Sequence, residues 1–353
     1  MGVAGPPSTS RPAPWRRLGR GAAYAVFVVA FVISGLELFA RSGMLTSAHS
    51  RAAEGARGGR GQVRVLILGD SFALEGRPQA PRAAEILRRY LEKRQVSVLN
   101  LAVGGFGPRD YQKQFRTWGE IYAPHLVLLF YYVGNDISDT KVGRRPFAPS
   151  AVLPLGDGAL GSAQRWLARA QGWSAVAPVI GDALGELRWA RRRHQFHVSL
   201  EQGTYQIVPD KRDYFSDSLL IRSAAAHEAW ETNKKLIADI AGRAGRWGAR
   251  LLVVICPATF QINRSNYNFY RRLGLTMDED MLLTSRPQQL FLAFCGESGL
   301  QCLDLLPAFR GAADEYYLEN DDHWNERGHR LAFELVRARL EAGDLLSVRS
   351  PGR

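Results

Sequence analysis

The chain has 353 residues, 46% of them hydrophobic, and a formal net charge of +12 at pH 7. This length and hydrophobic content provide at least one full-sized core, which excludes an intrinsically disordered protein. The many arginines favour contact with anionic surfaces or acidic glycans, although a solvated basic surface is the simpler interpretation. No nucleic-acid-binding signature is present, so nucleic acid is not an expected partner.

Residues 21–40 form an almost continuously apolar segment near the start of the chain. As a helix rising about 1.5 Å per residue, it matches the roughly 30 Å hydrocarbon layer of a bilayer. Four arginines in the basic segment 1–20 precede it, which favours a cytoplasmic amino terminus. We therefore predict a single-pass membrane anchor. The rest of the chain is expected outside the cytoplasm, in the periplasm if the cell has one. A cleaved signal peptide, giving a secreted protein, is the open alternative.

Residues 41–62 are rich in Gly, Ala and Arg and are predicted to form a flexible linker. Beyond it, short apolar runs alternate with amphipathic helical patterns, which indicates an α/β domain with a central parallel sheet. This domain is expected over 63–345. The predicted strands are Val63–Leu68, Val96–Leu101, Leu126–Tyr132, Arg250–Cys256 and Leu300–Leu303.

Helical spacing of apolar residues predicts four helices between and after these strands. The first follows Pro81, the second carries a stripe from Tyr111 to Ile121, and the third covers 226–247 with Gly248 as a cap. The last follows Asn325. Residues 141–223 do not fit the alternation, because turns rich in Pro and Gly interrupt them, and we predict an inserted cap there.

The three cysteines, Cys256, Cys295 and Cys302, lie in apolar surroundings without CxxC spacing. They are expected to be small core residues. A disulfide between Cys295 and Cys302 is an alternative if the domain lies outside the cytoplasm.

Four short polar motifs follow the strands or precede the last helix. Gly69-Asp70-Ser71 ends the first strand, a glycine-rich turn with Gly104 and Gly105 follows the second, and Asn135 follows the third. Asp321-Asp322-His323-Trp324 stands before the final helix. Each motif alone is typical of an ordinary turn. Because open α/β sheets bind ligands at the carboxyl edge of their strands, the four together indicate one site.

In these motifs and their order, the sequence resembles the SGNH/GDSL hydrolase family. The resemblance implies a flavodoxin-like three-layer α/β/α fold, with Ser71 as nucleophile and His323 as base. It also implies an oxyanion hole formed by the backbone N–H groups of Ser71 and Gly105 and the side chain of Asn135. Gly104 is an alternative to Gly105.

The residue three before His323 is Asn320, where the family usually has aspartate. The sequence is instead similar to an Asp-x-His-Trp variant found in membrane-associated relatives and in alginate O-acetylation proteins. Asp321 is therefore expected to orient His323, and Asp322 to be a turn residue or a charge at the start of the helix.

These assignments predict a serine esterase that cleaves acyl esters, short-chain or acetyl ones, through an acyl-enzyme at Ser71. The alternative is an O-acyltransferase or O-acetyltransferase acting on a cell-envelope polysaccharide, with an acylated glycan as partner. A glycan-binding relative without catalysis is the third hypothesis. No cofactor is expected, and no residue cluster with metal-ligand spacing predicts a metal.

Overall fold

The computed structural model describes residues 62–74, 82–141, 212–311, 316–343 and 345–346, together with residues 32, 34–36 and 180. The chain divides into two compact units, one made of 1–50 and 157–189 and the other of 51–156 and 190–353. All elements described below belong to the second unit. Among the described residues, no helix is both long and apolar enough to cross a membrane.

Three of the predictions fall largely on residues that the structure does not describe. Of the predicted anchor at 21–40, residues 32 and 34–36 are described, and they are helical. The linker at 41–62 is represented by residue 62, and the cap at 141–223 by residues 141, 180 and 212–223. The anchor, the linker and the cap therefore stay predictions.

The second unit is built on a five-stranded sheet in which every neighbouring pair is parallel. The strand order is β2-β1-β3-β4-β5, the flavodoxin-like order. The α/β fold with a central parallel sheet is thus confirmed, and each predicted strand is present with bounds shifted by at most one residue. The strands are β1 (Arg64–Leu68), β2 (Ser97–Asn100), β3 (Leu126–Tyr132), β4 (Arg250–Cys256) and β5 (Gln301–Asp304).

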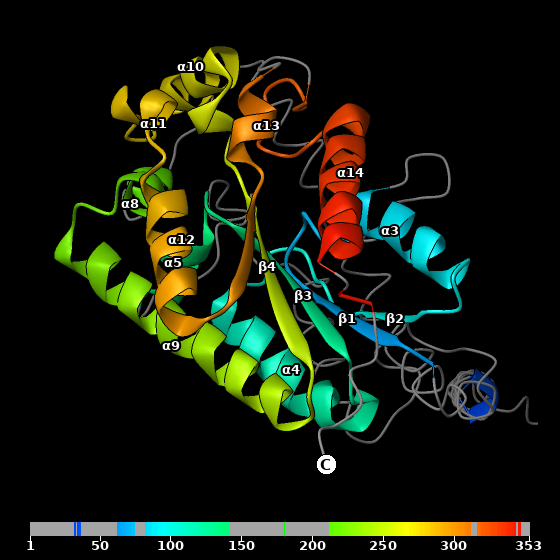
Figure 1. Ribbon diagram of the computed structural model, residues 1–353. Coiled ribbons are helices and arrows are strands. Elements are labelled where there is room, and N and C mark those ends of the chain that lie inside the picture. The colour runs from blue at the N-terminus through cyan, green and yellow to red at the C-terminus, as the bar shows by residue number, and fades with distance from the viewer. Residues whose placement is uncertain are drawn as a thin grey trace, which may run out of the picture. The chain divides into compact units, whose positions relative to one another are not determined.

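Helices cover both faces of the sheet (Figure 1). On one face α3 (Ala83–Glu92) packs against α14 (Glu326–Ala342). On the other face α4 (Pro108–Tyr122) packs against α9 (Ala224–Arg246), and α9 contacts α12 (Arg286–Ser298) through Trp230 and Phe291. Burial on both faces explains why β3 is apolar along its whole length and why β4 is apolar after Arg250.

The predicted helices are present, and one detail of the prediction was wrong. Gly248 stands two residues after the end of α9 with φ +72°, which confirms it as the predicted cap. Ile121 was expected to face the core, but it is 62% exposed at the last turn of α4, so that prediction was wrong. Helix α3 begins at Ala83, after Arg82, and Pro81 lies outside the described residues.

Several short helices have no counterpart in the sequence prediction. One group follows β4 and lies near α13 at one end of the sheet (Figure 1). Phe215 of α8 packs against Phe260 and Tyr270 from this group. The short helices are α5 (Asp136–Thr140), α8 (Tyr214–Leu220), η3 (Thr259–Gln261), α10 (Arg264–Arg272), α11 (Asp280–Leu283) and α13 (Leu306–Arg310).

Cys295 in α12 and Cys302 in β5 form a disulfide, with their Cα atoms 6.3 Å apart. The disulfide that the sequence left open as an alternative is therefore present in the structure. Cys256 is a free, fully buried thiol at the end of β4, as expected for a small core residue.

Candidate active site

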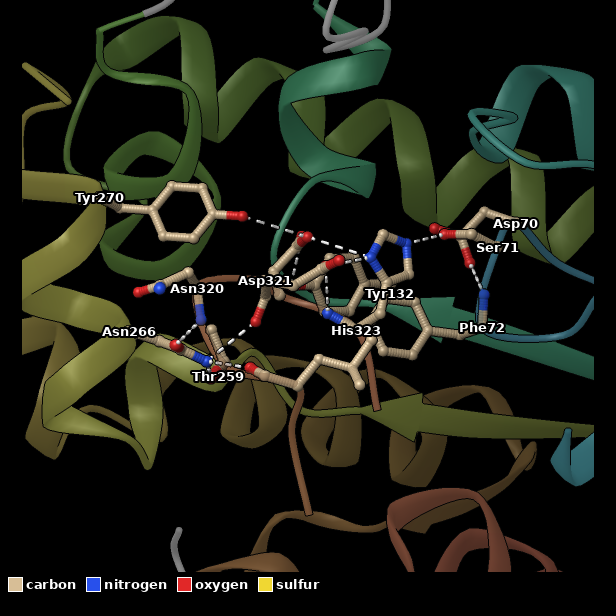
Figure 2. Close-up of polar contacts among 12 residues, drawn as sticks. Asp70, Ser71, Phe72, Tyr132, Thr259, Asn266, Tyr270, Asn320, Asp321 and His323 are labelled. Carbon is tan, nitrogen blue, oxygen red and sulfur yellow. Dashed lines mark hydrogen bonds and ion pairs between the residues drawn. The ribbon is translucent and has the colours of Figure 1, made fainter. Parts of the chain in front are cut away.

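The carboxyl ends of β1 and β3 and the loop before α14 bring the predicted residues to one place. Ser71 lies in the turn after β1, and Asn135 follows β3 directly before α5. His323 comes from the loop between α13 and α14. Figure 2 shows the imidazole of His323 between Ser71 on one side and Asp321 on the other.

Ser71, His323 and Asp321 form a continuous chain of hydrogen bonds. The Nε2 atom of His323 lies 2.8 Å from the Oγ of Ser71, and its Nδ1 lies 2.6 Å from Oδ1 of Asp321. The same Asp321 oxygen also accepts the backbone N–H of His323 at 3.0 Å. A carboxylate at Nδ1 favours the tautomer that leaves Nε2 free to accept the serine proton. The geometry therefore suits a serine nucleophile with a histidine base.

Asp322 does not lie where the sequence led us to expect it. Its Oδ1 lies 3.3 Å from Nδ1 of His323, and its Oδ2 accepts a hydrogen bond from the Tyr132 hydroxyl at 3.1 Å. Its side chain is 17% exposed, against 28% for Asp321. The prediction of a turn residue or helix-start charge was wrong, because the loop turns this carboxylate inward beside the imidazole.

The two carboxylates change the proton affinity of the imidazole. Burial disfavours the charged form of His323, but the charges of Asp321 and Asp322 outweigh it and raise the pKa of His323 from 6.5 to about 9. A base must be unprotonated to accept a proton. Catalysis through His323 is therefore expected to increase as the pH rises towards about 9.

Asn266 of α10 holds the loop that carries Asp321. Its side-chain amide donates to the carbonyl oxygens of Asp321 at 2.8 Å and Leu318 at 3.0 Å, and to the hydroxyl of Thr259 at 3.0 Å. Its Oδ1 accepts the backbone N–H of Asn320 at 2.8 Å. Asn266 is 1% exposed, so these bonds are shielded from water. Figure 2 shows this anchor below the triad.

We expect Asn266→Ala to lower the free energy of unfolding by about 3 kcal/mol and to reduce any activity of the site, because it leaves several buried polar groups without partners. Urea unfolding of both proteins measures the change. Asn268→Ala, in the same helix at a half-buried position, is the matched control and should stay within about 0.5 kcal/mol. Equal losses in the two variants would contradict the anchoring role.

An aromatic stack supports the imidazole. The Phe72 ring lies between Tyr132, at 4.0 Å, and His323, at 5.4 Å between centroids, and Trp324 meets its edge. Gly134 makes room for this arrangement, since a Cβ there would lie 2.4 Å from the Tyr132 ring. The stack fixes the plane of the imidazole that meets Ser71.

The glycine-rich turn after β2 is tied to the nucleophile turn. The Val103 N–H donates to the Gly69 carbonyl at 3.2 Å, and the Asn100 side chain donates to the Ala73 carbonyl at 2.9 Å. Gly105 has φ +79°, a conformation that favours glycine. Gly104 has an ordinary φ, and both glycines are exposed. Their roles as oxyanion donors stay a prediction.

A buried carboxyl lies directly beside the nucleophile. Burial raises the pKa of Asp70 to about 6, against the opposing effects of the Phe72 N–H, His323 and the Asn135 side chain. Its Oδ1 accepts the Phe72 N–H at 3.0 Å, and within the described residues its Oδ2 has no hydrogen-bond partner. The buried Oδ1 of Asn135 also has none there. Asp70 and the Asn135 side chain thus lie close to each other beside the nucleophile turn.

A second buried carboxyl, Asp136, begins α5. It accepts hydrogen bonds from the Tyr111 hydroxyl at 2.9 Å and from the Tyr132 N–H at 3.0 Å. Burial and the nearby charges of Asp70 and Asp139 raise the pKa of Asp136 well above its usual range. The hydrogen bonds hold the turn that presents Asn135.

His329, the other histidine near the site, is a packing residue. It is 7% exposed, and its Nδ1 accepts the Ala83 N–H at 3.3 Å. Burial, with Arg82 and His323 nearby, lowers the pKa of His329 to about 3. The neutral ring therefore joins α14 to the start of α3.

Comparison with known proteins bears on the carboxyl-terminal half of the site. Residues 214–351, which carry Asp321 and His323, match the family model described as the SGNH hydrolase-like domain of the acetyltransferase AlgX. Over these residues the match confirms the resemblance to SGNH hydrolases, and the motifs around Ser71, Gly105 and Asn135 lie outside it. No curated protein sequence matches the chain.

Solved structures with a similar fold share little sequence with the chain. The lipase/acylhydrolase from Enterococcus faecalis is 11% identical with a TM-score of 0.42, covering 82% of this chain and 100% of its own. A GDSL-like lipase from Bacteroides thetaiotaomicron is 9% identical with a TM-score of 0.42, covering 84% and 98%. An acetyl xylan esterase is 13% identical with a TM-score of 0.41, covering 79% and 100%.

Proposed function

We propose that the chain is a serine-dependent acyl-transfer enzyme that forms an acyl-enzyme at Ser71. The single observation that carries the proposal is the hydrogen-bond chain from Ser71 Oγ through His323 to Asp321, with distances of 2.8 and 2.6 Å. A serine hydroxyl becomes nucleophilic when a positioned imidazole removes its proton, and this arrangement supplies that imidazole.

In the proposed reaction, Ser71 Oγ attacks the ester carbonyl while its proton passes to Nε2 of His323. Asp321 holds the imidazole and stabilises the imidazolium. The N–H groups of Ser71 and Gly105 and the Asn135 amide are the proposed donors to the oxyanion, where one donor contributes about 3 kcal/mol in other enzymes. His323 then returns the proton to the departing alcohol, which leaves the acyl group on Ser71.

Two acceptors would complete the reaction. Water gives an esterase, whereas a sugar hydroxyl gives an O-acetyltransferase acting on a cell-envelope polysaccharide. The match of residues 214–351 to the domain of an acetyltransferase supports the second candidate at least as well as the first. Both use the same serine, base and oxyanion donors.

We place the enzyme outside the cytoplasm, anchored through residues 21–40. The apolar composition of that segment and the arginines before it support this location. The disulfide between Cys295 and Cys302 also supports it, because disulfides persist in oxidising compartments.

The first test is to label the full chain with a fluorophosphonate. The second is to supply unlabelled chain with an acetyl ester, in the presence and in the absence of a soluble polysaccharide fragment. Mass spectrometry should place the label on Ser71. Free acetate alone would identify an esterase, and acetylated fragment would identify a transferase. A label on another residue, or no label with no turnover of any ester, would contradict the proposed function.

A further inference from the structure

Asp322 contacts the imidazole from a different direction than Asp321. Its Oδ1 lies 3.3 Å from Nδ1 of His323, whereas Oδ1 of Asp321 lies 2.6 Å from the same nitrogen. Two carboxylate oxygens thus face one N–H. Asp321 also accepts the backbone N–H of its own loop, and it is the more exposed of the two side chains.

Two tyrosines from separate elements hold the Asp322 carboxylate. The hydroxyl of Tyr132, at the end of β3, donates to Oδ2 at 3.1 Å, and the hydroxyl of Tyr270, in α10, lies 3.5 Å from Oδ1. Burial and the Asp322 charge raise the pKa of Tyr132 well above its usual range, so its hydroxyl stays protonated and remains a donor. The carboxylate is therefore fixed by groups outside its own loop.

The charged and titratable groups around His323 come from several elements. Asp321 and Asp322 lie on its own loop, Asp70 on the β1 turn, Tyr132 at the end of β3, and His329 on α14. The Tyr270 hydroxyl faces Asp322, whereas the nearby Tyr317 hydroxyl donates to the Pro257 carbonyl, and Arg82 lies near His329. Asp321, Asp322 and Asp70 each stabilise the charged form of His323. Asp321 forms the short hydrogen bond to Nδ1, and Asp322 lies near the same nitrogen at the longer distance.

We propose that Asp322 is a second positioning carboxylate, which shares the Nδ1–H of His323 with Asp321 and stabilises the imidazolium formed when Ser71 loses its proton. The role in turnover rests on the proposed function. In this arrangement Asp321 sets the orientation of the ring through its short bond, and Asp322 adds negative charge from a position fixed by the two tyrosines.

The test is Asp322→Asn in the full chain, with two readouts. Removing a carboxylate within about 4 Å should lower the pKa of His323 by about 1 to 2 units, followed by NMR titration of its imidazole C–H signals. The apparent pKa in the pH profile of kcat/KM for an acetyl ester should fall equally. KM should stay within about twofold, because Asp322 is not proposed to touch the substrate.

The titration separates this proposal from the proposed function. An unchanged imidazole pKa in Asp322→Asn would overturn the proposal whatever the activity. Absence of turnover in the wild type would overturn the proposed function, and with it the catalytic role of Asp322, while the titration still measures the contact. If the variant fails to fold, Asp321→Asn is titrated instead, because it leaves Asp322 as the carboxylate at Nδ1. A His323 pKa still above 6.5 in Asp321→Asn supports the proposal, and a pKa at or below 6.5 overturns it.

Discussion

Replacing Ser71 with alanine should lower kcat for an acetyl ester by about 10⁴-fold or more. Alanine has no Oγ, so no acyl-enzyme forms, although the oxyanion donors and the substrate-binding groups remain. Labelling by a fluorophosphonate should disappear together with turnover. Initial rates and gel-based detection of the label measure both effects on the same preparation.

The fold should survive this change. Alanine removes the hydrogen bond to Nε2 of His323, but the Ser71 carbonyl still accepts from Arg82. Ser216→Ala, at a serine of α8 whose hydroxyl bonds the Asp213 carbonyl, is the matched control and should keep full activity. Ester cleavage that persists in Ser71→Ala at more than about a tenth of the original rate would refute the nucleophile.

Replacing Asp321 with asparagine should lower kcat by about 10⁴-fold, the loss seen when the corresponding acid of a serine protease is changed in the same way. An asparagine amide that donates towards Nδ1 favours the tautomer with a proton on Nε2, which then cannot accept the serine proton. The protein should still fold, since the amide fits the same volume. Steady-state kinetics across the pH range, with circular dichroism as a check of folding, make the measurement.

Glu319→Gln is the matched control for this variant. It removes the same charge from an exposed position two residues earlier in the same loop, and kcat should change by less than about twofold. If Asp322→Asn abolished turnover at every pH while Asp321→Asn retained it, the roles assigned to the two acids would have to be exchanged.

The sheet and its helices could be predicted because both depend on local patterns. A strand buried on both faces is apolar, as β3 is along its length and β4 is after Arg250, and an amphipathic helix repeats its apolar residues at helical spacing. The same reasoning placed Ser71, Asn135 and His323 at strand ends and before the last helix. It failed for Ile121 at the end of α4, because Tyr122, four residues after Trp118, is the residue that continues the buried stripe there.

The second carboxylate and the loop anchor could not be predicted from the sequence. Asp322 is held by Tyr132 and Tyr270, and Asn266 is far along the chain from the loop that it bonds, so each depends on contacts between distant segments. The available signal for Asn266 was a hydrophilic residue on the buried face of an amphipathic helix. Such a residue must have a hydrogen-bond partner, but the sequence does not say which group that partner is.

The acids around the nucleophile also have a thermodynamic consequence, which is proton uptake on folding. The folded-state pKa values of Asp70, Asp136 and His323 are all raised, so between each unfolded and folded value the native chain binds more protons than the unfolded chain. The contribution of these groups to stability therefore falls as the pH rises, that of Asp70 between 3.8 and about 6 and that of His323 between 6.5 and about 9. The proton that must leave His323 before it can act as a base is one that folding has taken up, and the alkaline range that frees the base is the range in which the fold loses part of its stability.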